Sequence, residues 1–271
     1  MDIIANKIDL KKWCFALLCL FALPLTMVSQ EVCDIITDSL DIPLPRKDLN
    51  EQILRRTGYT VSYNADFRIP NWVAWHLTAD RIKGTAIRPS GNAWHEDDEV
   101  SCPRATNEDY RNSGWSRGHM CPAGDCKWDE QVMYESFLYT NCCPQDRSFN
   151  SGDWNEIEIK CRRWAEKYGD IYIVCGPILY NREHRTIGKN RIVVPEAFFK
   201  VVLCFIDGKP EGVGFICKNE NEGKQVSSYV NTIHEVERIT GYTFFPSLPA
   251  EWEDSAKGRI SSLLNSDSMR K

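Results

Sequence analysis

The chain has 271 residues, of which 26% are charged and 42% hydrophobic, and its formal net charge is −5. These fractions are ordinary for a globular protein, and the sequence contains no internal repeat and no long low-complexity segment. The acidic balance argues against a protein that coats DNA stoichiometrically, although it permits a local basic face.

Residues 1–29 have the pattern of a cleaved secretory signal. Three lysines precede an apolar run from Trp13 to Leu25. This run is shorter than the ~20 apolar residues that a membrane-spanning helix needs. We place the cleavage near Ser29/Gln30, with a retained membrane anchor as the alternative. The prediction is a secreted or periplasmic protein that has no membrane attachment after cleavage.

Ten of the twelve cysteines follow this signal. An even and high number of cysteines in an exported protein predicts disulfides, and we expect at least three. The alternative is a zinc site, because Cys121-x4-Cys126 and Cys142-Cys143 lie close together in the sequence. Zinc sites usually contain a Cys-x2-Cys pair, which this sequence lacks.

The first half of the mature chain is predicted to be mainly strand and loop. Residues 30–56 form an N-terminal arm, with a short helix expected at Leu49–Arg56. Runs of β-favouring residues predict strands at Thr60–Tyr63 and Trp72–Leu77. Ile87–Asn112 is polar and predicts a long surface loop pinned by Cys102. A short strand is expected at Phe137–Thr140.

The second half alternates helix and strand. Apolar residues at three- and four-residue steps predict a helix over Asn150–Tyr168. A strand is expected at Ile171–Val174 and is broken by Gly176-Pro177, and a hairpin over Phe198–Ile206 and Gly212–Lys218. A helix over Tyr229–Thr240, capped by Ser228, follows. Residues 251–271 read as a loose polar tail. Strands and helices mixed in this way indicate an α+β fold.

The residues between Ser116 and Glu158 carry the chemistry. The sequence contains Ser116-Arg117-Gly118-His119, then Asn141-Cys142-Cys143-Pro144-Gln145, and then Asn150 and Glu158. Hydrolysis of a phosphodiester requires a base for water, a cation for phosphate and oxygen ligands for a hard metal ion, and these residues supply all three.

This stretch resembles the DNA/RNA non-specific endonuclease family, the ββα-metal nucleases. The family signature is Asp-Arg-Gly-His, then Asn-x-x-Pro-Gln, then an Asn followed eight residues later by Glu. The chain matches it in order and spacing, except that Ser116 stands where the family often has Asp. Similar flanks extend the resemblance over roughly Gly58 to Pro249. It implies a ββα-metal nuclease fold over residues 57–250, with a central antiparallel sheet and helices on both sides.

His119 is the candidate general base, because a neutral imidazole accepts a proton near neutral pH. A structural histidine in a turn is the alternative. On an extended strand Arg117 shares its face with His119 and can hold phosphate oxygens, unless it forms only a surface salt bridge. Gly118 lets the backbone pass close to substrate or metal.

Asn150 is the candidate ligand for Mg²⁺, with Mn²⁺ as a substitute ion, because an amide oxygen is a hard neutral donor. The alternative is a helix N-cap. Glu158 lies ~12 Å further along the expected helix, so we expect it to hold a metal-bound water rather than the ion itself. A solvated helix carboxylate is the alternative for Glu158.

The resemblance implies that Asn141 lines the active site and that Gln145 supports it, although both could be turn formers. His76 stands where a member of the family has an arginine. A phosphate-binding charge is therefore either weakened there or supplied by another residue such as Arg81, and His76 can also be a simple strand residue.

The resulting hypothesis is a metal-dependent endonuclease that cuts DNA and RNA with little sequence specificity and leaves 5′-phosphate ends. The alternatives are a non-catalytic nucleic-acid-binding relative, a phosphodiesterase for small nucleotides, and a disulfide-rich surface protein with an accidental match. A homodimer is left open by the sequence.

Overall fold

The computed structural model describes residues 40–261 and 263–264. The predicted signal peptide, the first part of the N-terminal arm and the end of the C-terminal tail lie outside these residues. No helix among the described residues is long and apolar enough to cross a membrane.

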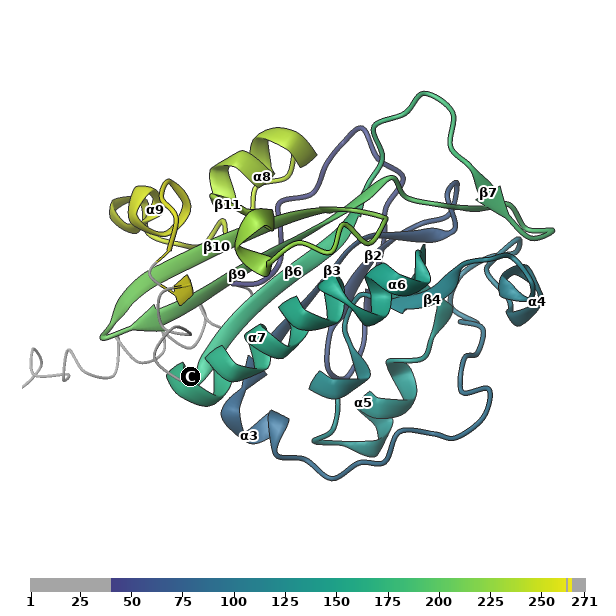
Figure 1. Ribbon diagram of the computed structural model, residues 1–271, viewed down its shortest axis with the longest axis horizontal. Coiled ribbons are helices and arrows are strands. Elements are labelled where there is room, and N and C mark those ends of the chain that lie inside the picture. The colour runs from purple at the N-terminus through teal and green to yellow at the C-terminus, as the bar shows by residue number, and fades with distance from the viewer. Residues whose placement is uncertain (1–39, 262, 265–271) are drawn as a thin grey trace, which may run out of the picture. The chain divides into compact units, whose positions relative to one another are not determined.

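A seven-stranded antiparallel sheet forms the centre of the fold, in the order β1-β2-β3-β6-β9-β10-β11 (Figure 1). Its strands are β1 (Gln52–Arg55), β2 (Thr60–Asn64), β3 (Ile69–Thr78), β6 (Asp170–Ile178), β9 (Ala197–Ile206), β10 (Lys209–Lys218) and β11 (Val230–Asn231). The hairpin of β9 and β10 turns at Asp207-Gly208, where both residues have positive φ. This is the backbone that a two-residue hairpin requires.

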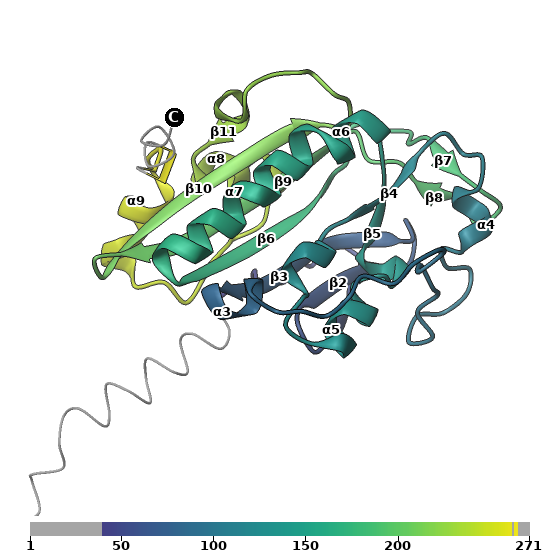
Figure 2. The same cartoon turned by 60° about the horizontal axis from the view of Figure 1, so that its bottom comes forward.

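The two faces of the sheet are buried against different helices. Along β9, Phe198 and Val202 belong to one hydrophobic cluster, whereas Phe199 and Val201 belong to another. Successive side chains of a strand point to opposite faces, so both faces are covered. α7 (Asp153–Tyr168) packs on the first face, while α8 (Ile233–Thr240) and α9 (Ala250–Lys257) pack against β10 on the second (Figure 2).

The expected α+β architecture, with an antiparallel sheet between helices, is therefore confirmed. A separate two-stranded sheet pairs β4 (Ser116–His119) with β5 (Cys142–Gln145), and the candidate residues Arg117, His119 and Gln145 lie on it. The remaining elements are short. They are α3 (Ala79–Ile82), α4 (Asn107–Tyr110), α5 (Glu130–Glu135), α6 (Arg147–Ser151), β7 (Thr186–Ile187), β8 (Ile192–Val193) and 3-10 turns at Ala123–Asp125, Tyr139–Asn141 and Val226–Tyr229.

Several predicted elements were wrong in type. The expected helix at Leu49–Arg56 is the outer strand β1, which pairs with β2 because its residues complete the sheet. The expected strand at Phe137–Thr140 is largely a 3-10 turn. The C-terminal tail contains α9, whose Ala256 is buried in the second cluster.

Other elements differ in their bounds. The helix predicted over Asn150–Tyr168 is interrupted at Gly152, whose backbone (φ −103°, ψ −108°) separates α6 from α7. β6 continues through Gly176-Pro177, because both residues stay in register with β9. α8 begins only at Ile233, where Thr232 rather than Ser228 caps it, and ends as predicted at Gly241, which is left-handed.

The disulfide prediction is also wrong for the described residues, in which nine cysteines are free and eight of these are buried. They fill the core as small apolar side chains, and burial raises the pKa of several thiols, such as Cys142 to about 12. Cys102 is exposed and pins nothing. The loop over Ile87–Asn112 is anchored instead by Asp97, which forms an ion pair with Arg56 (2.5 Å) and accepts a hydrogen bond from Thr140 Oγ1 (2.6 Å).

Candidate active site

Asn141 fixes the backbone around β4. Its side chain is fully buried, and its Oδ1 accepts a hydrogen bond from Cys121 N (2.8 Å). Its Nδ2 donates to Cys121 O and to Ser136 O, both at 2.8 Å. The Asn141 amide is therefore committed to the main chain that follows His119. It positions the site instead of lining it, which corrects the role that the resemblance implied.

Gly118 and Gln145 are packed directly against each other across the β4–β5 pair. A Cβ at Gly118 would lie 2.0 Å from Gln145 Oε1, so no larger residue fits without displacing the amide. Gln145 is fully buried, and neither of its amide atoms has a hydrogen-bond partner among the described residues. Gln145 thus supports β4 from behind, and we do not place it among the groups that contact substrate.

His119 ends β4 and lies in an aromatic slot. Its ring is 4.4 Å from the ring of Trp94 and 5.0 Å, edge-on, from that of Phe137. The side chain is half-buried, and its Nε2 is buried with no partner within the described chain. Burial, with the nearby charge of Arg88, lowers the pKa of His119 to about 3. The imidazole is therefore neutral at physiological pH and its orientation is fixed by two rings.

Arg88 is the functional candidate that the sequence did not reveal. Its guanidinium lies over the ring of Phe137 (5.3 Å to the centroid). Its charge lowers the pKa of His119 and that of Glu158, so it acts on both sides of the site. It comes from the long loop between α3 and α4, where no periodic pattern or motif marks it. Arg88 is exposed, and its charge is available to an anion.

Arg117 lies on β4 with His119, as expected, but most of its guanidinium is already engaged. Nε donates to the Tyr139 hydroxyl (3.1 Å), and Nη2 donates to Asn107 Oδ1 (2.5 Å). Its carbon Cζ also lies 5.3 Å from the Tyr110 ring centroid. These contacts hold the α4 segment against β4, which makes Arg117 a less available phosphate ligand than Arg88.

Glu158 is half-buried on α7 and is the acidic group of the site. Burial raises the pKa of Glu158 to about 7, although Lys200, Arg162 and Arg88 oppose that rise. Its ionisation is therefore poised near neutrality, unlike that of a solvated helix carboxylate.

Asn150 lies on α6, which contacts β4. Asp146 caps this helix through its Oδ1, so the N-cap alternative for Asn150 is wrong. No cluster of three or more His, Cys, Asp or Glu side chains that could hold a metal occurs among the described residues, which also removes the zinc alternative there. A single amide oxygen as protein ligand suits Mg²⁺, which keeps most of its waters, and does not suit an ion that needs a full protein cage.

His76 does not belong to the site. It lies on β3, where it stacks on Tyr172 (4.6 Å) and its Nε2 is hydrogen-bonded to Asp170 Oδ1 (2.7 Å). Tyr172 belongs to the cluster under α8 and α9, so His76 faces away from α7. Arg81 is no substitute, because it donates to His76 O and lies over the Trp128 ring. We therefore do not include His76 among the groups proposed to contact substrate.

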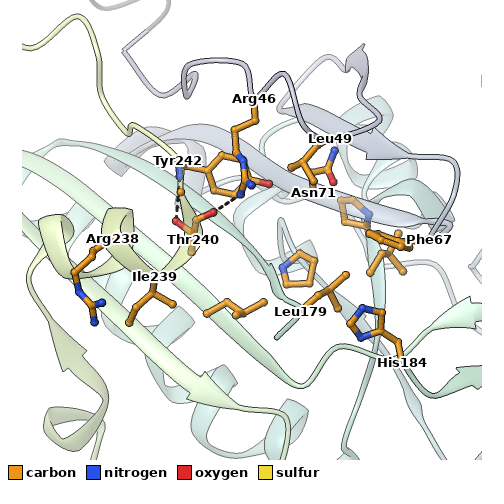
Figure 3. A pocket seen from close by; sticks show the side chains of 15 residues that line it. Arg46, Leu49, Phe67, Asn71, Leu179, His184, Arg238, Ile239, Thr240 and Tyr242 are labelled. Atoms are coloured by element: carbon orange, nitrogen blue, oxygen red, sulfur yellow. Dashed lines mark hydrogen bonds between the residues drawn. The ribbon is translucent and has the colours of Figure 1, made fainter. Parts of the chain in front are cut away.

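Two of the hollows among the described residues bear on the position of the site. One of about 500 Å³ opens beside the site, where Trp94, Asn107 and Tyr139 line it. The other, of about 450 Å³, lies away from it, with His184 and Tyr242 among its lining residues (Figure 3). Its polar groups are satisfied internally, because His184 pairs with Glu196 (2.9 Å) and Arg46 donates to Thr240 O.

Comparison with known proteins decides the family. The family model described as DNA/RNA non-specific endonuclease matches residues 45–251. The chain belongs to this family. It is 35% identical over 206 residues to the mitochondrial nuclease EXOG of Danio rerio, an alignment that covers 71% of this chain and 60% of that protein. It is 33% identical to nuclease C1 of Cunninghamella echinulata var. echinulata, covering 72% and 83%.

A second group of relatives is endonuclease G. The mitochondrial endonuclease G of Bos taurus is 32% identical, with 73% of this chain and 71% of that protein aligned. The crystal structure of the EndoG/EndoGI complex, which concerns the mechanism of EndoG inhibition, superposes with a TM-score of 0.69 at 28% identity, covering 75% of this chain and 89% of that one. The chain spans only about 60% of the length of the EXOG relatives.

The contact between Gly118 and Gln145 predicts a specific failure and its repair. Gly118→Ala should lower the free energy of unfolding by about 1–3 kcal/mol, because the new methyl group overlaps the Gln145 amide. Gln145→Ala added to Gly118→Ala should recover most of that loss. Denaturant unfolding of the two single variants and the double variant measures both effects. A double variant no more stable than Gly118→Ala would contradict the packing.

Arg88 and His76 provide a matched comparison of two positions. Arg88→Ala should lower the rate of nucleic-acid cleavage about 10²-fold, the scale of losing one group that stabilises transition-state charge. His76→Ala should leave the rate near that of the parent, since its ring faces the other side of the sheet. Cleavage rates on one plasmid under identical conditions test this. A larger rate loss in His76→Ala than in Arg88→Ala would contradict it and would indicate that His76 contributes to the site.

Proposed function

We propose that this protein is a metal-dependent endonuclease that hydrolyses phosphodiester bonds of DNA and RNA with little sequence specificity. The observation that carries the proposal is His119, whose Nε2 has no partner among the described residues and lies in an aromatic slot beside the Arg88 charge. A neutral base beside a free cation suits an attack by water on a phosphate.

His119 would take the proton from the attacking water through Nε2. Its pKa of about 3 in the free protein ensures that the nitrogen is unprotonated, although it makes the base weak. A bound phosphate adds a negative charge close to Arg88 and to the imidazole. Opposite charge favours the protonated imidazole, so substrate raises the basicity of His119 when the proton must be accepted.

Asn150 would hold the metal ion through its amide oxygen, and Glu158 would accept a hydrogen bond from water in the outer shell of that ion. When bound, Mg²⁺ supplies positive charge to a phosphate oxygen and to the leaving 3′-oxygen. Arg88 stabilises the charge that develops on the phosphate. Arg117 holds the α4 segment in place and presents the remaining part of its guanidinium to the substrate side of β4.

The range of substrates follows from the part of the nucleic acid that the site contacts. The proposed contacts are made to phosphate and not to base edges, so duplex DNA, single strands and RNA should all be cut. Cleavage should weaken as salt rises, because phosphate contacts release counterions. We further propose 5′-phosphate products, since the leaving group is the 3′-oxygen. A phosphodiesterase for small nucleotides would instead prefer dinucleotides to plasmid.

The experiment is incubation of the purified protein with plasmid, RNA and a dinucleotide, with Mg²⁺ or with EDTA, for the parent and two variants. His119→Ala should cost roughly 10²-fold or more in rate without loss of folding, because the base is gone. Asn150→Ala should lose activity that excess Mg²⁺ partly restores, because the base remains but the ion is held weakly.

Thermal unfolding provides the control for both variants. A purely structural role predicts that melting temperature and activity fall together and that extra Mg²⁺ recovers nothing. Near-parental turnover in His119→Ala would remove the mechanism, and a parent that cuts no nucleic acid with Mg²⁺ would remove the function.

A further inference from the structure

Lys200 on β9 is a lysine with no exposed surface. Its Nζ lies 4.4 Å from the ring centroid of Trp154 and 5.2 Å from that of Trp75. It has no hydrogen-bond partner within the described part of the chain. A buried ammonium without hydrogen bonds is costly, so opposite charges must stabilise it. The two indole faces supply part of that stabilisation.

The opposite charge comes from the α7 side. Lys200 has the same parity on β9 as Phe198 and Val202, whose side chains belong to the cluster under α7. On α7, Trp154, Glu158 and Arg162 follow at four-residue intervals and therefore share one helix face. Trp154 is the residue against which Lys200 packs, so Glu158 is carried by the same face one turn further along.

Arg162, which lies one turn beyond Glu158 on α7, is linked to Lys200 through Asp125 and Trp75. Arg162 Nη1 forms an ion pair with Asp125 Oδ1 (2.9 Å), and Trp75 Nε1 donates to Asp125 Oδ2 (3.1 Å). Trp75 is also one of the two rings that hold Lys200. Two cations and two carboxylates thus lie on this side of the sheet with balanced charge; Lys200 and Asp125 are buried, whereas Glu158 and Arg162 are half-buried. The arrangement depends on all four members, because removing one leaves an uncompensated buried charge.

We propose that Lys200 acts through Glu158 in the hydrolysis reaction, because its buried charge beneath α7 keeps the Glu158 carboxylate ionised. The inference rests on the proposed function and adds to it a residue that touches neither substrate nor metal. Lys200 acts through Glu158, and Arg162 with Asp125 completes its surroundings.

The ionisation behaviour of the cluster agrees with this role. Burial raises the pKa of Glu158 to about 7, and Lys200 is the strongest of the groups that oppose the rise. Burial by itself would lower the pKa of Lys200. The thiols of Cys175 and Cys161 oppose this only when ionised, so at neutral pH the carboxylates of Glu158 and Asp125 are the groups that favour the charged ammonium. The facing thiols of Cys161 and Cys175 have pKa values raised to about 12 and remain neutral. Arg88 is the remaining cation that acts on Glu158.

The test is the pH dependence of plasmid cleavage by the full chain at saturating Mg²⁺. The parent should gain activity as pH rises through the pKa of Glu158. Lys200→Met should move this acid limb upward by about one pH unit or more, because an opposite charge has been removed. At pH values below this acid limb, kcat of Lys200→Met should be about tenfold lower than that of the parent at the same pH, while KM changes little. At alkaline pH the rate of the variant should return to that of the parent. In a Glu158→Gln background, Lys200→Met should produce no further shift.

Lys257 provides a matched control. It is also buried, but its Nζ pairs with Glu237 (3.1 Å) and Glu253 (3.0 Å) against α8 and α9, on the other face of the sheet. Lys257→Met should lower the melting temperature and leave the acid limb where it is. An acid limb that Lys200→Met moves no further than Lys257→Met does, or a rate loss that is equal at every pH, would overturn the proposal.

A readout that does not use activity separates this proposal from the proposed function. Carboxyl NMR titration of Glu158 in the parent and in Lys200→Gln measures its pKa directly, and Lys200→Gln keeps a polar group if Lys200→Met does not fold. The Glu158 pKa should be higher in the variant by about one unit or more. An unchanged Glu158 pKa would refute the role of Lys200 even in a protein that cuts DNA.

Discussion

The hydrogen bonds of Asn141 to Cys121 and Ser136 are the constraint on which the site depends. They tie the backbone after β4 to the turn that precedes β5, so the two strands meet in one register and His119 is held at the end of β4. A buried amide with three bonds to main chain leaves that backbone little freedom, because each lost bond would strand a buried polar group. The close contact of Gly118 with Gln145 fixes the same pair of strands from behind.

Burial shifts the pKa values of the two titratable groups of the site in opposite directions. It lowers the pKa of His119 to about 3 and raises that of Glu158 to about 7, since desolvation always disfavours the charged form. The imidazole is thus ready to accept a proton over the whole physiological range, whereas the carboxylate is the group whose charge changes near neutrality. A rise in activity near neutral pH is therefore expected from Glu158 and not from the histidine, whose pKa lies far lower.

The sequence alone indicated His119, Asn150 and Glu158 as candidates, because they lie in short motifs with a spacing that can be recognised without a fold. It also predicted the β9–β10 hairpin, where the turn residues and the β-favouring runs agree. It did not predict Arg88, which comes from a loop with no local pattern and reaches the site only through packing on Phe137. Tertiary contacts likewise decide β1, which becomes a strand because β2 offers it an edge.

The central claim is that the free protein presents His119 as a neutral base in an aromatic slot. The most direct measurement is an NMR titration of the His119 ring, assigned by comparison with His119→Ala, in the protein without metal or nucleic acid. The account predicts an imidazole that stays unprotonated well below the ordinary histidine value of ~6.5, with a pKa of about 3. An imidazole that titrates near 6.5 would contradict it, because the ring would then be solvated and not held as the structure places it.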